Sequence, residues 1–117
     1  MHIPPKEAAR LCIYTGENDK FDGRPIYELI LEKAKQNGLA GGTVLRGVAG
    51  FGANSRVHTL KLLRLSEDLP LTIEIIDDPE KIDAFLPEID AILSEGLVTL
   101  EPVQVICYRH NEGKKNK

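Results

Sequence analysis

The hydrophobic pattern predicts an α+β domain of the ferredoxin-like class, a sandwich with the element order βαββαβ. Four segments show the alternation typical of strands, and two others carry apolar residues at helical spacing. A long, initially polar segment separates the second strand from the third. We therefore expect a four-stranded antiparallel sheet with two helices on one face and an extended loop between the second and third strands.

The composition is that of one ordinary globular domain. The chain has 117 residues, 42% of them hydrophobic and 28% charged, which is enough for a real core. Its net charge of −3 argues against general binding to nucleic acid, which needs a basic surface. Because there is no apolar run long enough for a membrane span and no secretory signal, we expect a single cytoplasmic domain over residues 1–117, without direct membrane insertion.

The first half of the chain predicts a strand and a helix. Residues 1–6, with two consecutive prolines, are expected to form a loose arm. Residues 7–15 alternate as a strand, and Pro25 suits the first position of a helix that stops at Gly38. The next strand spans about 42–52 and contains several glycines.

The second half predicts a strand, a helix and a final strand. In the strand 70–77, Glu74 lies on the face opposite the most apolar residues. Asp78-Pro79 opens the second helix, Pro87 should kink or split it, and Gly96 ends it.

The last strand region covers 97–110, with an interruption at Glu101-Pro102, and residues 111–117 form a polar tail that we expect to be disordered. The two cysteines, Cys12 and Cys107, lie in strand-like segments, so we expect buried free thiols rather than a disulfide.

One face of the predicted sheet has no helix to cover it. Its residues are too apolar for open water, so we expect neighbouring subunits to cover it in a symmetric oligomer. The candidates are Cys12, Tyr14, Thr72, Ile76, Ile106 and Tyr108.

The glycine-rich stretch 41–59 has two interpretations. Glycines beside Arg46, Arg56 and His58 suit a phosphate site, because an unobstructed backbone can donate N–H groups to an anion. A bulge or hairpin corner needs the same glycines, and the polar residues then belong to a solvated loop. Arg46, within the strand, could equally form an intersubunit ion pair.

Other candidate chemistry is sparse. Glu74 needs a partner in its apolar strand, either an Arg or Lys in the trimer or a ligand hydroxyl or amine. The three histidines lack ligand spacing, and no nucleophile–base arrangement can be argued, so we expect neither a metal site nor an enzyme.

Several motifs together resemble one family. The chain is similar to the PII-like signalling proteins, and within them to the uncharacterised family called domain of unknown function 190. The resemblance covers about residues 9–109. It is carried by Gly38–Val44, Arg46–Gly52, His58-Thr59, Leu65–Pro70 and Ile73–Asp77.

This resemblance implies a regulatory homotrimer that binds an adenine nucleotide in the clefts between subunits. The implied ligand-binding residues are Arg46, Gly50, Phe51, Gly52, Ala53, Arg56, Glu74 and Arg109. PII proteins have a lysine-containing loop before the last strand, but residues 94–101 have no lysine and two acids. An AMP-like ligand is therefore favoured over ATP, and a protein with no nucleotide ligand remains an alternative.

The resemblance also implies that residues 53–68 act as a T-loop-like segment that contacts a partner. Its partner-contacting residues would be His58, Leu62, Leu63 and Arg64. Members of the family are linked with fluoride-exporting membrane proteins, which suggests a membrane transporter as partner. Two alternatives remain: a ligand-free accessory subunit of such an exporter, and a copper-binding trimer of the CutA type.

Overall fold

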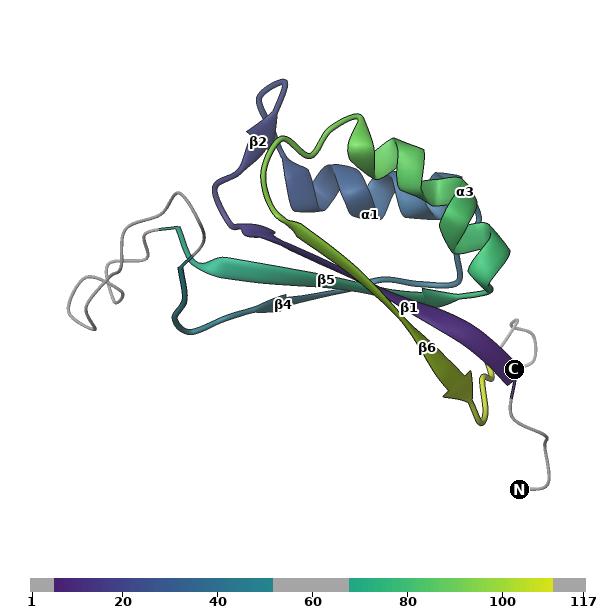
Figure 1. The fold of residues 1–117 in the computed structure, drawn as a ribbon. Helices are drawn as coiled ribbons and strands as arrows, with labels where there is room; N and C mark the ends of the chain where they lie inside the picture. The colour runs from purple at the N-terminus through teal and green to yellow at the C-terminus, as the bar shows by residue number, and fades with distance from the viewer. Residues whose placement is uncertain (1–5, 52–67, 111–117) are drawn as a thin grey trace, which may run out of the picture.

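The computed structural model describes residues 6–51 and 68–110 and has the predicted ferredoxin-like arrangement (Figure 1). Its main sheet is antiparallel throughout, in the order β4-β5-β1-β6. Two helices lie together on one face of this sheet (Figure 1). The elements are β1 (Lys6–Gly16), α1 (Ile26–Gln36), β4 (Thr43–Arg46), β5 (Pro70–Asp77), α3 (Pro79–Asp90) and β6 (Leu97–Val105).

The core lies between the sheet and the helices. Leu11 of β1 is paired with Ile75 of β5 on one side and with Leu100 of β6 on the other. Because side chains alternate along a strand, Leu11 and Ile13 face the helices while Arg10 and Cys12 face the opposite side. The largest fully buried side chains are Leu11, Ile13, Ile26, Ile30, Ile73, Ile75, Ile82 and Phe85.

The helix boundaries follow the predicted signals. Pro25 precedes α1, and Gly38 follows it with a φ of +77°, which favours glycine after a helix. Pro79 is the first residue of α3. Asp78 stands at the N-cap as expected, but its side chain makes no capping hydrogen bond and binds Lys6 instead, at 2.8 Å.

A kink or a split was predicted at Pro87, and the split is wrong, because α3 runs through Pro87 as one helix. Pro87 cannot donate to the carbonyl of Asp83. Both residues are exposed, so that carbonyl can bind water. The helix ends at Asp90 rather than at Gly96. Gly96, with φ +146°, is needed because a Cβ there would lie 2.6 Å from the carbonyl oxygen of Tyr14.

The last strand also differs from its prediction. It is continuous through Glu101-Pro102, with Pro102 opposite Ala9. Proline is tolerated there because β6 is an edge strand and one side of it needs no hydrogen bond. The strand ends at Val105 and not at residue 110.

The glycine-rich strand is shorter than predicted, because β4 ends at Arg46 and residues 47–51 lie beyond it. A small hairpin of β2 (Lys20–Phe21) and β3 (Arg24–Pro25) was not predicted. Its Asp22-Gly23 turn has positive φ at both residues, as a tight hairpin requires.

The prediction that both thiols are buried holds for one of them. Cys12 is buried in the sheet, while Cys107 is exposed because it lies beyond the end of β6; both are free. Neither helix of the described ranges is long and apolar enough to cross a membrane. Residues 1–5 of the predicted arm, residues 53–67 of the predicted loop 53–68 and the tail 111–117 lie outside the described residues. Lys6, predicted to be the last residue of the arm, is the first residue of β1.

The buried aromatic side chain of α3 provides a test of this core. Phe85 is 1% exposed, so Phe85→Ala should leave a cavity and lower the free energy of unfolding by about 3–5 kcal/mol. The matched control is Phe21→Ala, because Phe21 is 40% exposed on the small hairpin; its cost should stay below about 1 kcal/mol. Urea denaturation of both variants measures the difference, and equal losses would contradict the assignment of the core.

Candidate functional site

The sheet face opposite the helices is uncovered in the single chain. Cross-strand pairing brings Cys12 beside Glu74 and Tyr14 beside Thr72, as the alternation predicted. Large apolar side chains remain exposed on this face and at its edges, although water is a poor environment for them. They include Tyr14, Leu45, Ile76, Leu97, Ile106 and Tyr108.

An ion cluster lies in the middle of this face. The Nη1 of Arg10 donates to Oε2 of Glu74 at 3.3 Å, and its Nη2 donates to Oε2 of Glu101. The cluster therefore joins β1, β5 and β6. Glu101, with smaller contributions from Cys12 and Glu74, holds the pKa of Arg10 above its ordinary value against the opposing effect of burial.

This cluster contains the basic partner that Glu74 was expected to need. It is Arg10 of the same chain, which was not singled out from the sequence. The signal was present, since Arg10, like Glu74, is a charged residue within an alternating apolar strand. The Nε of Arg10 is buried and makes no hydrogen bond within the described part of the chain.

A groove of about 550 Å³ opens beside this cluster, between the start of β4, the end of β5 and the segment after β6. The backbone of Gly41 and Gly42 forms one side, and nothing lies within 4 Å of where a Cβ of Gly41 would be. Its lining residues are Lys6, Ala8, Ala40, Gly41, Gly42, Thr43, Glu74, Ile76, Asp77, Asp78, Lys81, Val105, Cys107 and Tyr108.

The charged residues at one end of the groove hold its shape. Lys6 binds Asp78, and the hydrogen bond between them raises the pKa of Lys6 and lowers that of Asp78. Asp77 accepts from the backbone N–H of Ala40 at 2.7 Å, which fixes the chain just before β4. Lys81 donates to the carbonyl of Gly38 at 3.1 Å.

The predicted glycine site lies at the other end of β4. The N–H of Gly47 donates to the carbonyl of Pro70 at 2.7 Å, and a Cβ at Gly47 or Gly50 would lie 2.8 or 2.9 Å from the Pro70 ring. These glycines are therefore explained by close packing on Pro70. Phe51 is 69% exposed just beyond this turn.

Within the described part of the chain, the predicted ligand residues do not lie together. Glu74 lies opposite Thr43 and lines the groove, whereas Arg46 lies three residues further along β4, about 10 Å away, and faces Glu17. Arg109 is exposed, next to the groove residue Tyr108. The remaining predicted residues lie outside the described part: Gly52, Ala53, Arg56, His58, Leu62, Leu63 and Arg64.

No group of three His, Cys, Asp or Glu side chains in the described ranges could hold a metal ion. The acidic residue Asp19 has a structural role in a turn. Its carboxylate accepts from the hydroxyl of Thr15 at 2.7 Å and from the N–H of Gly16 at 2.9 Å.

Comparison with known proteins shows the family. Residues 8–105 match the family model DUF190, described as "Uncharacterized ACR". The chain belongs to the DUF190 family. A UPF0166 protein of Aquifex aeolicus (strain VF5) is 44% identical to this DUF190 chain over 106 residues, which cover 91% of the chain and 98% of that protein. A UPF0166 protein of Methanocaldococcus jannaschii is 36% identical over 100 residues, which cover 85% and 92%.

Solved structures share the fold of this DUF190 protein. A putative PII-like signalling protein from Thermus thermophilus has a TM-score of 0.61 at 14% identity, with 89% of this chain and 94% of that one covered. The protein CPII from Thiomonas intermedia K12, bound to ADP and bicarbonate, has a TM-score of 0.58 at 20% identity, with 88% and 92% covered. The PII-like fold inferred from the sequence motifs is thereby confirmed.

Substitution of two glycines of the DUF190 chain tests whether Gly47 is tightly packed and Gly41 faces open space. Gly47→Ala should lower the free energy of unfolding by about 1–3 kcal/mol, because the new methyl group would press on Pro70. Gly41→Ala should change it by less than about 0.5 kcal/mol, because that position faces the groove. Equal effects in urea denaturation would contradict this assignment.

Proposed function

We propose that this protein is a PII-like regulatory homotrimer that binds an adenine nucleotide, AMP in preference to ATP, at the clefts between subunits. In this proposal the ligand signals to a partner through the segment 53–68. The observation that carries it is the groove, because it opens on an uncovered apolar sheet face beside a glycine backbone and an acceptor carboxylate.

The groove has the size and chemistry of a site for a heteroaromatic base. Its volume of about 550 Å³ lies within the ordinary range for small-molecule sites. Ala8 and Ile76 supply apolar walls, while Thr43 and Glu74 supply polar groups that can orient a ligand. The missing side chain of Gly41 leaves room for a ring to approach the backbone.

The charges around the groove favour a ligand with little negative charge. Its lining includes two lysines but three acids, Glu74, Asp77 and Asp78, and Lys6 is already paired with Asp78. A triphosphate would add several negative charges beside these acids, whereas a monophosphate adds fewer. This supports the preference for AMP.

In a trimer, the groove at the start of β4 and the glycine turn beyond its end could belong to one site formed by two subunits. Covering the exposed apolar face would remove Tyr14, Leu45 and Leu97 from water. The glycine turn 47–51 and Arg46, which are distant from the groove of their own chain, could then meet the groove of a neighbour. The similarity of the fold to CPII, whose structures hold ADP and AMP, also supports the proposal.

The outward surface at the glycine turn supports a partner as well. Val48 and Phe51, which precede the segment 53–68 in the sequence, are 89% and 69% exposed. A ligand-free accessory subunit of an ion exporter would use the same surface, so the two functions differ in ligand binding.

Calorimetry with AMP, ADP, ATP and cyclic AMP tests the ligand. We expect AMP to bind most tightly to a protein whose mass by light scattering is that of a trimer. Gly41→Val should weaken AMP binding by at least about tenfold, because the new side chain would occupy the groove, where nothing lies within 4 Å of its Cβ position.

The matched control is Ala84→Val, on the exposed side of α3, which should bind AMP as the unaltered protein does. If intact trimers bind none of these nucleotides, the ligand proposal is wrong and the accessory-subunit alternative gains. Unchanged AMP binding by Gly41→Val would place the ligand elsewhere.

A further inference from the structure

The carboxylate of Glu74 can determine which ligands the groove accepts, a role that rests on the proposed nucleotide function. Glu74 is an acid on the apolar floor of the groove, between Thr43 on β4 and Cys12 on β1. In the described part of the chain, Arg10 donates to Oε2 of Glu74. That bond uses one oxygen of the carboxylate and leaves Oε1 for a ligand.

Arg10 is held on both sides. Its second terminal nitrogen donates to Glu101 on β6, so the guanidinium bridges three strands. Arginine presents its donors in a planar, rigid fork. A guanidinium fixed at Glu101 therefore limits where the Glu74 carboxylate can lie.

An ionised carboxylate can accept hydrogen bonds but cannot donate them. A ligand that presents a donor to it gains a charge-assisted hydrogen bond. A ligand without that donor displaces water from the carboxylate but makes no hydrogen bond to it. A binding site discriminates most strongly against analogues that leave one of its polar groups unpaired in this way. Adenine has such a donor in its amino group at C6.

We propose that Arg10 is a positioning residue that holds the Glu74 carboxylate toward the groove, and that this carboxylate selects purines with an amino group at C6 over purines without one. Arg10 acts through Glu74 and does not itself contact the ligand. Glu101 anchors Arg10 from the other side.

The test compares two probes by calorimetry near neutral pH: AMP and purine riboside 5′-monophosphate, which has hydrogen in place of the amino group. The unaltered protein should bind AMP about 10- to 100-fold more tightly. Glu74→Gln keeps the shape but removes the charge, and should reduce this ratio to below about fivefold. Arg10→Gln should reduce the ratio similarly, and Arg10→Lys should restore part of it.

The matched control is Glu88→Gln, which makes the same change at the Lys33–Glu88 ion pair between the two helices. Because Glu88 does not line the groove, the ratio should stay within about threefold of the original. If Arg10→Gln weakens both probes equally, Arg10 is only structural and the proposal is wrong. Because Glu74→Gln leaves Arg10 in place, it tests the selection even if the Arg10 variants do not fold.

Two further outcomes distinguish a failure of the selection by Glu74 from a failure of the proposed nucleotide function. If the unaltered protein binds AMP and purine riboside monophosphate equally tightly, the selection by Glu74 is wrong while the nucleotide function stands. If 2′-deoxy-AMP loses affinity while purine riboside monophosphate does not, Glu74 contacts the ribose and the assignment to the base is overturned. If none of the probes binds, the inference fails together with the proposed function.

Discussion

The pairing of β1 with β5 on one side and β6 on the other is the constraint on which the rest of the structure depends. Because this strand is central, each of its faces must be occupied. Leu11 and Ile13 anchor the core beneath the helices, and Arg10 and Cys12 form the middle of the other face. A slip of one residue would exchange the two faces, burying a guanidinium in the core and exposing the leucine.

Much of the fold could be predicted because strong periodicity survives in every main element. The misjudged points are those where tertiary context decides. Pro102 is tolerated only because β6 is an edge strand, and Pro87 only because the carbonyl it leaves unpaired is on an exposed side of α3. The end of β4 depends on the packing of Gly47 against Pro70, which is more than twenty residues away in the sequence.

The candidate site was less predictable, since it is assembled across the sheet. Glu74 could be singled out because a charge in an apolar strand needs a partner, but the partner, Arg10, is 64 residues away and is identified only by the strand register. The groove joins Gly41 to Tyr108, and no local pattern links those segments. Gly50, which the family resemblance implied, lies beyond the other end of β4 and does not line the groove.

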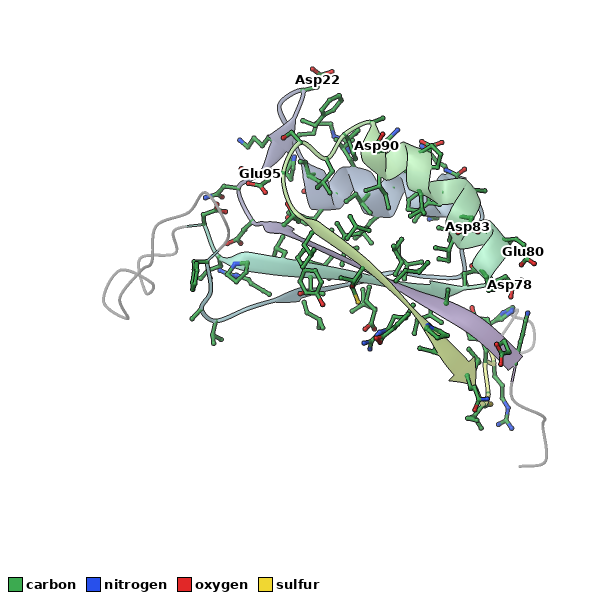
Figure 2. All side chains as sticks on the ribbon, viewed as in Figure 1. Asp22, Asp78, Glu80, Asp83, Asp90 and Glu95 are labelled. Atoms are coloured by element: carbon green, nitrogen blue, oxygen red, sulfur yellow. The ribbon has the colours of Figure 1, made fainter. Side chains whose placement is uncertain are left out.

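The antiparallel pairing of β1 and β6 has a practical consequence for handling this protein. Lys6 lies opposite Val105, so β1 begins and β6 ends at the same end of the sheet, and both residues line the groove. A bulky label attached at Lys6 or Val105 would therefore crowd the groove. The turn at Asp22-Gly23 lies on the helix side (Figure 2), which makes it the better attachment point for a reporter.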